Sequence, residues 1–157
     1  MRRLMDLVAG DAREILLVVG TDDIAALDDR RRFRAHLALG GGLDPTWLDL
    51  FSEAARTVTG QGEPMDFLDA RLELEGPDSQ DDGLTIERVD PSWVTAVARL
   101  ADGSIDSIAG RWIDLVEEEL GMLPREEKPW IRELAGQVVA FCRVADAAPD
   151  VLFLWSL

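Results

Sequence analysis

The spacing of apolar residues predicts four helices with one buried face each, three of them in the second half of the chain. Apolar side chains recur there every three or four positions, as on one side of an α-helix. Capping residues or prolines mark the starts of these segments, and glycines mark several of the ends. The expected helices run over 44–59, from the Asp90 cap to Gly103, from the Ser104 cap to Gly121, and from near Pro129 to Ala145.

Four shorter segments predict β-strands. In residues 33–39 and 68–75 apolar and polar side chains alternate, which is typical of a strand with one buried face. Residues 84–88 form a third short segment that leads directly into a helix cap. Residues 151–155 have no polar face, which favours a C-terminal strand in the interior of a sheet.

Together these patterns predict an α+β fold. Residues 12–19 fit either a helix or a buried strand, and the Ala-Arg-Glu sequence at their start favours a helix. Helices outnumber strands, and the two types are mixed along the chain. We therefore expect a helix-rich single domain over residues 1–157, with one small sheet that includes the C-terminal strand.

The net charge of the chain limits the kinds of molecule that it is expected to bind. The 157 residues include 31 acidic and 16 basic side chains, which give a formal net charge of −15. Such a chain repels DNA, RNA and anionic lipid, since those partners bind proteins through Lys and Arg. We expect neither a nucleic acid nor a membrane as partner, whereas a basic protein would be attracted.

The N-terminal segment and the cysteine content favour a reducing, cytoplasmic setting. Asp6 interrupts the first apolar run, which is too short for the core of a signal peptide, and the longest apolar stretches, 15–19 and 151–155, are too short to span a bilayer. One cysteine excludes an internal disulfide, and one cysteine with one histidine excludes an ordinary zinc site. We expect no metal and no other cofactor, and the oligomeric state stays open.

Clusters of carboxylates are the first candidate functional feature. Such clusters are common on the solvated faces of helices and turns, but with this net charge they also suit a docking surface for a basic protein. Residues 78–83 resemble the start of a calcium loop, yet Val89 stands at the twelfth position, where that loop needs a glutamate. The candidate docking residues are Asp78, Asp81, Asp82, Glu117, Glu118 and Glu119.

His36 is the second candidate, because any Ser-His or Cys-His mechanism must use the one histidine of the chain. If residues 33–39 form a strand, His36 and Arg34 project from the face opposite the apolar residues, towards solvent or a pocket. No nucleophile accompanies them, and Cys142 lies on an apolar helix face, where packing is its expected role. We therefore assign no catalytic residue and keep Arg34 and His36 as a candidate ligand site beside the turn at 40–42.

The five tryptophans, Trp47, Trp93, Trp112, Trp130 and Trp155, all fall on predicted apolar stripes or strands. Core packing explains them without a ligand.

Residues 89–155 resemble the YfbM-like family of small bacterial α+β proteins. The shared features are two consecutive helices, a last helix and a short apolar C-terminal strand. In the first half of the chain, the segment His36-Leu37-Ala38-Leu39-Gly40 is more weakly similar to a His-containing segment of the family. The residues that carry the resemblance are Val94, Val97, Ala98, Leu100, Trp112, Leu134, Phe141 and Ala145. The resemblance implies a fold and no activity.

Two functional hypotheses follow. The first is a non-catalytic, acidic protein-binding module of a bacterial cell, comparable to an immunity protein or an antitoxin that neutralises a basic partner. The alternative is a small enzyme or small-molecule binder with its site around His36 and Arg34.

Overall fold

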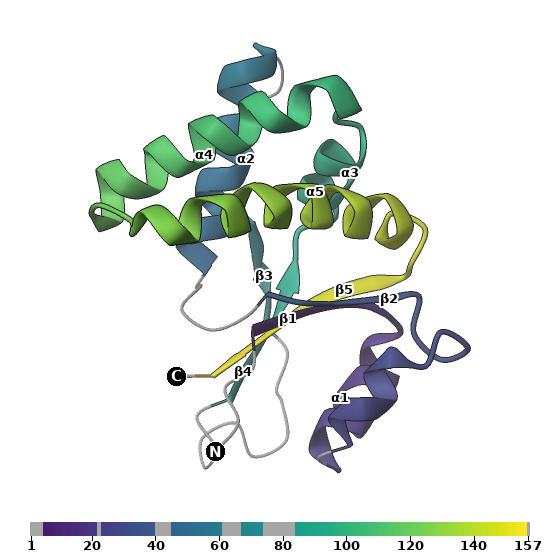
Figure 1. The fold of residues 1–157 in the computed structure, drawn as a ribbon. Coiled ribbons are helices and arrows are strands. Elements are labelled where there is room, and N and C mark those ends of the chain that lie inside the picture. Colours follow the sequence, from purple (N-terminus) through teal and green to yellow (C-terminus); the bar gives the residue numbers. More distant parts are fainter. Residues whose placement is uncertain (1–4, 22, 40–44, 61–66, 74–83, 157) are drawn as a thin grey trace.

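An antiparallel sheet built from both ends of the chain lies at the centre of the fold (Figure 1). The computed structural model describes residues 5–21, 23–39, 45–60, 67–73 and 84–156. In this described part, five strands form one sheet in the order β2-β1-β5-β4-β3. The strands are β1 (Met5–Gly10), β2 (Ala35–Ala38), β3 (Leu68–Glu73), β4 (Leu84–Val89) and β5 (Asp150–Ser156). The C-terminal strand is therefore interior, as predicted.

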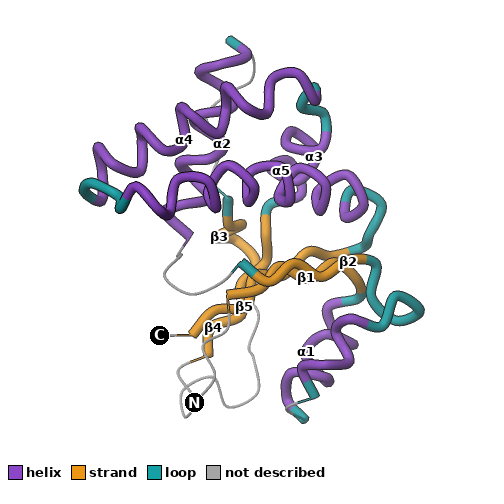
Figure 2. The backbone as a smooth tube through the Cα atoms, in the orientation of Figure 1, coloured by secondary structure: helices purple, strands orange, loops and turns teal. Residues whose placement is uncertain are grey.

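Helices pack on both faces of the sheet (Figures 1 and 2). The larger layer consists of α2 (Pro45–Thr59), α3 (Pro91–Ala98), α4 (Ile105–Leu120) and α5 (Lys128–Ala145). The opposite face carries α1 (Ala12–Gly20) and the short 3-10 helix η1 (Ile24–Asp28). Two further 3-10 turns, η2 (Asp102–Ser104) and η3 (Arg125–Glu127), precede α4 and α5.

A chain of aromatic rings forms the centre of the main core, between the larger helical layer and the sheet. Trp112 contacts both Trp47 and Phe51 edge to face, and its indole Nε1–H donates a hydrogen bond of 2.8 Å to the Trp47 carbonyl. Trp93 and Phe67 continue the chain down to the sheet. Edge-to-face pairs add to the free energy gained by burying these large rings.

A second, smaller core lies under α1 and η1. Its buried members come from the strands as well as from these helices. They are Val8, Ala12, Ile15, Val18, Val19, Leu27, Phe33, Ile86, Leu152 and Leu154. Helix α1 agrees with the helix favoured by the sequence, whereas η1 was not predicted, because it spans only five residues and shows no helical period.

The predicted elements are largely confirmed, with two differences. The helix favoured for residues 12–19 is confirmed as α1. Strand β1 was not predicted, because both of its faces are buried and Asp6 interrupts its apolar run. Helix α3 ends at Ala98 rather than at Gly103, and a 3-10 turn separates it from α4.

The prediction that packing explains every tryptophan is wrong for Trp130, whose surface is 38% exposed. It stands in the first turn of α5, outside the chain of rings described above. For α3 the capping prediction is confirmed, since the Asp90 side chain accepts a hydrogen bond of 2.8 Å from the Ser92 amide. No helix in the described residues is long and apolar enough to cross a membrane.

Candidate functional site

The last turn of α4 carries three of the predicted docking residues, Glu117, Glu118 and Glu119. We call residues 117–127 the α4–α5 corner. The Glu117 carboxylate holds the backbone of this corner in place. One of its oxygens accepts a hydrogen bond of 3.1 Å from the Leu123 amide, and the other lies 3.5 Å from Lys128 Nζ. Helix α4 ends at Gly121, whose amide donates to the Glu117 carbonyl at a φ of 103°.

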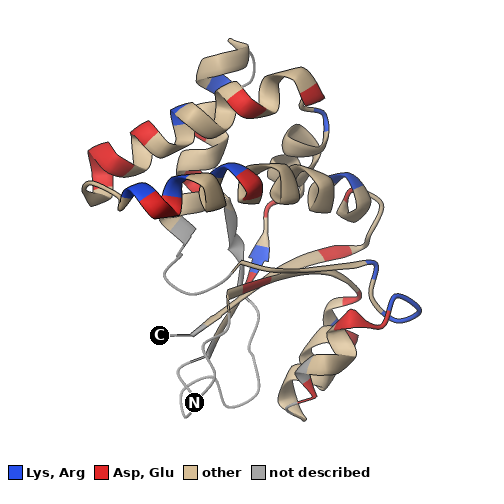
Figure 3. Cartoon of the chain, viewed as in Figure 1, with Lys and Arg blue, Asp and Glu red and all other residues tan. Residues whose placement is uncertain are grey.

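The corner is strongly negative. It contains five glutamates and one arginine, hence a net charge of −4. Three of the glutamates stand in the last turn of α4, which holds no basic residue. That end of a helix is already the negative pole of the helix dipole, so carboxylates there disfavour the fold locally. Figure 3 shows acidic positions gathered at the end of α4, and acidic and basic positions mixed at the start of α5.

Two large apolar side chains are exposed among these charges. Leu120 is 51% exposed and Met122 is 83% exposed. Leu120 follows Val116 at the helical spacing that predicts a buried position, but the last turn of α4 extends past the sheet (Figure 1). Exposed apolar side chains surrounded by charge are typical of the centre and rim of a protein interface.

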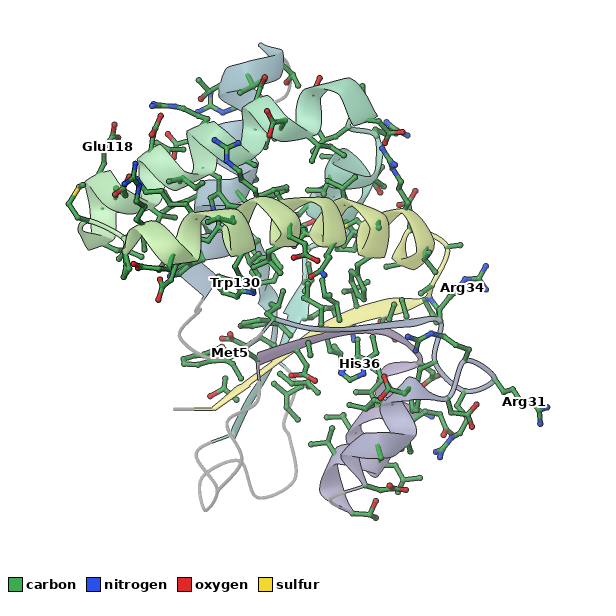
Figure 4. The ribbon with its side chains drawn as sticks, in the orientation of Figure 1. Met5, Arg31, Arg34, His36, Glu118 and Trp130 are labelled. Atoms are coloured by element: carbon green, nitrogen blue, oxygen red, sulfur yellow. The ribbon has the colours of Figure 1, made fainter. Side chains whose placement is uncertain are left out.

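The predicted docking residues do not all share one environment. Glu118 and Glu119 are exposed, and Glu118 makes a loose ion pair of 3.8 Å with Arg111 (Figure 4). Glu117 is largely buried and holds the turn, so its carboxylate has a structural role. The other predicted cluster, Asp78, Asp81 and Asp82, lies outside the described residues, as does the turn at 40–42.

The conformation of Gly121 gives a prediction for the corner. A Cβ at this position meets no atom within 4 Å, but a φ of 103° with a ψ of 167° is a region that other residues rarely adopt. We expect Gly121→Ala to lower the free energy of unfolding by about 1–3 kcal/mol. Gly103→Ala is the matched control, since Gly103 has space for a Cβ and no positive φ. Urea unfolding of both variants checks this prediction. An equal loss of unfolding free energy in the two variants would contradict it.

His36 lies under the sheet, between two carboxylates. Its Nε2 is 2.5 Å from Asp6 Oδ2 on β1, and its Nδ1 is 2.8 Å from Asp28 Oδ1 at the end of η1. The His36 side chain is 9% exposed, so the prediction that its strand face exposes it is wrong. The reason is the second helical layer, which covers that face.

Arg34 does not join His36 in a site. Figure 4 shows its side chain extending outward at the edge of the sheet, whereas the His36 ring lies beneath the strands. Arg34 is exposed, and its backbone amide pairs with the Ala9 carbonyl at 2.8 Å. The side chains of Arg34 and His36, the two residues of the alternative hypothesis, therefore point in different directions.

The surroundings of His36 favour its charged form. Burial by itself lowers the pKa of His36, but hydrogen bonds and charge from Asp6 and then Asp28 outweigh it and raise this pKa above 6.5. A ring that holds both protons has no free lone pair, so it cannot accept a proton from a substrate. The arrangement is therefore unlike that of a general base.

Cys142 and the carboxylates of the described residues are further candidate reactive groups. Cys142 is buried in the main core, and burial raises the pKa of its thiol far above the usual range, which makes it inert. Among the described residues, no group of three or more His, Cys, Asp or Glu side chains could hold a metal ion.

A small cavity of about 80 Å³ lies where β4 leads into α3 and α5 leads into β5. Its polar groups pair with one another: Arg88 Nη1 donates to Asp150 at 2.7 Å, and the Thr95 hydroxyl donates to Asp146 at 2.7 Å. Small-molecule sites usually enclose roughly 300–1,000 Å³. This cavity is too small for such a role.

Sequence reasoning missed the partners of His36 and the apolar centre of the corner. Asp6 gave a usable signal, because a charged residue inside an apolar run needs a buried partner. Asp28 gave none, since its contact with His36 depends on how η1 folds back. The exposure of Leu120 depends on where α4 ends relative to the sheet, which periodicity does not report.

Comparisons with protein-family models, with curated proteins and with solved structures gave no match. The resemblance to the YfbM-like family stays a prediction.

Proposed function

We propose that this protein is a non-catalytic binding module that docks a basic protein at the α4–α5 corner. The observation that carries the proposal is the exposure of Leu120 and Met122 within a turn of net charge −4. An interface of standard type has an apolar centre that excludes water and a polar rim that selects the partner. The corner offers both.

The placement of charge supports the same conclusion. Glu118 and Glu119 stand at the negative pole of α4, where they do not help the helix. The ion pair that Glu118 makes with Arg111 is 3.8 Å long and exposed, so it contributes little to stability. A surface that is unfavourable for the fold is well suited to attract Lys and Arg side chains of a partner.

The expected partner presents lysines or arginines around one apolar side chain. Association with it should be fast and sensitive to salt, because the net charge of −15 steers a basic molecule from a distance. A neutraliser of the immunity or antitoxin kind fits this description. The alternative, a ligand site at His36 and Arg34, is less well supported because the ring nitrogens already face carboxylates and Arg34 points elsewhere.

Capture from a lysate of the native host tests the proposal when matched variants are compared. We expect wild-type protein to retain a basic protein that moderate salt releases, and Glu118→Lys/Glu119→Lys to reduce its yield by about tenfold or more. The control Asp23→Lys/Glu53→Lys changes the net charge equally at exposed sites outside the corner and should keep most of the yield.

A second pair of variants separates the contribution of the apolar side chains to binding from the contribution of charge. Leu120→Ser/Met122→Ser should weaken capture at all salt concentrations, whereas Leu17→Ser/Val144→Ser removes exposed apolar side chains elsewhere and should leave capture intact. Equal yields from the corner variants and their controls, read by quantitative mass spectrometry, would contradict docking at the corner.

A further inference from the structure

The Asp6–His36–Asp28 cluster joins the sheet to a segment that carries a cluster of arginines. Asp6 belongs to β1 and His36 to β2, whereas Asp28 is the last residue of η1. The contact from Asp28 to His36 closes a loop whose seven intervening residues include Arg30, Arg31 and Arg32. We call residues 29–34 the basic loop. Figure 3 shows it as a positively charged projection at one edge of the molecule.

Hydrogen-bond counting shows that the cluster has two states. A protonated imidazole has two N–H groups and donates to both carboxylates, whereas a neutral imidazole has one N–H and donates to one. In the neutral state, the other ring nitrogen presents a lone pair to a carboxylate at 2.5 or 2.8 Å, which is repulsive. Loss of one proton therefore breaks one of the two contacts.

Burial decides which contact breaks. The Asp6 side chain is 10% exposed, and the Asp28 side chain is 69% exposed. Water can replace the hydrogen bond of Asp28, but it cannot reach Asp6 as easily, and an unsatisfied buried carboxylate is costly. The remaining N–H stays on Asp6, and Asp28 turns away from the ring.

We propose that Asp6, His36 and Asp28 form a proton-dependent latch that fixes the η1 end of the basic loop against the sheet and releases that end when His36 becomes neutral. The other end stays anchored by the buried Phe33 ring and by the hydrogen bond from the Arg34 amide to Ala9. The latch goes beyond the docking function proposed above, since it lies on the opposite layer of the sheet from α4 and α5. Among the described residues, the charged groups that act on the ring are the carboxylates of Asp6 and Asp28.

The direction of the pH dependence follows from the same cluster. The hydrogen bonds to the two carboxylates raise the pKa of His36 above 6.5 despite its burial. The stability that the latch contributes is therefore complete below pH 6.5, the unfolded value, and is lost as the pH rises through the folded value. The η1 end of the loop is fixed at low pH and released at high pH.

Amide hydrogen exchange of the basic loop tests the latch. Its reporters are the amides of Asp29, Arg32 and Phe33, which pair with backbone carbonyls of η1 and of the loop. From about pH 5.5 to about pH 9, and after correction for intrinsic rates, we expect their protection to fall by about tenfold in the wild type. Protection of α4 and α5 should not change in parallel. The one histidine of the chain gives an unambiguous proton resonance that reports the ionisation in the same samples.

Three variants complete the experiment. His36→Gln should leave the loop weakly protected without the pH-dependent fall. Asp28→Asn should also remove the fall, because its amide can accept from the protonated ring and donate to the neutral ring, and it keeps the test valid if His36→Gln does not fold. The matched control Asp23→Asn makes the same charge change at an exposed site whose side chain does not cap η1, and should behave as the wild type. Protection in the wild type that does not depend on pH, or an equal fall in Asp28→Asn, would overturn the latch.

Discussion

Trp112→Ala is expected to lower the free energy of unfolding by about 3–5 kcal/mol, the usual range for deleting a fully buried tryptophan. Trp112 has no exposed surface and connects two helices of the main core, through ring contacts with Trp47 and Phe51. The substitution leaves a large cavity, and it also removes the hydrogen bond from the indole N–H to the Trp47 carbonyl.

Two further variants separate these contributions. Trp112→Phe keeps most of the ring but removes the indole N–H, so it should cost about 1–2 kcal/mol. Trp130→Ala makes the same truncation at a tryptophan that is 38% exposed, and it should cost much less. Urea unfolding followed by circular dichroism measures all three, because fluorescence would change with the tryptophan count. A similar loss for Trp112→Ala and Trp130→Ala would contradict the described core.

Asp150→Ala is expected to lower the free energy of unfolding by about 2–3 kcal/mol, because Asp150 connects three elements of the fold. Its carboxylate accepts a hydrogen bond of 2.7 Å from Arg88 on β4 and one of 3.0 Å from the Ala12 amide, the first of α1. The substitution leaves Arg88 partly buried without its counter-ion, and no hydrogen-bond partner of the Arg88 Nε is found among the described residues.

Asp102→Ala is the control for Asp150→Ala. It breaks an ion pair with Arg143 of the same 2.7 Å length, but the Asp102 carboxylate is exposed, so the cost should stay below about 1 kcal/mol. Added salt should reduce the small effect at Asp102 and leave most of the effect at Asp150. Urea unfolding at two salt concentrations checks both values, and equal costs would contradict the structural role of Asp150.

The larger helical layer could be predicted from the sequence because each helix has one buried face and a polar opposite face. In α4, for example, Ile108, Trp112 and Val116 repeat at four-residue spacing, and Gly121 marks the end. Strand β1 could not be predicted by the same reasoning. It is buried on both faces, so apolar and polar residues do not alternate along it. In addition, Asp6 interrupts its apolar run.

The candidate sites were predictable only in part. Glu118 and Glu119 could be named as exposed carboxylates because acidic runs at helix ends face solvent. The exposure of Met122 could not be predicted, since it depends on the turn that follows α4. The burial of His36 depends on η1, which folds back over a strand face that local sequence marks as polar. Contacts between segments distant in sequence decide these features, and local periodicity does not encode them.

Site-specific photo-cross-linking at position 122 tests the docking proposal most directly. A photoreactive residue replaces Met122, and a matched protein carries the same residue at the exposed position Val144, near the other end of α5. Illumination in a lysate of the native host should join a basic protein to position 122 and not to position 144, and moderate salt added beforehand should abolish the product. Absence of a specific product at position 122, or the same product at both positions, would contradict docking at the α4–α5 corner.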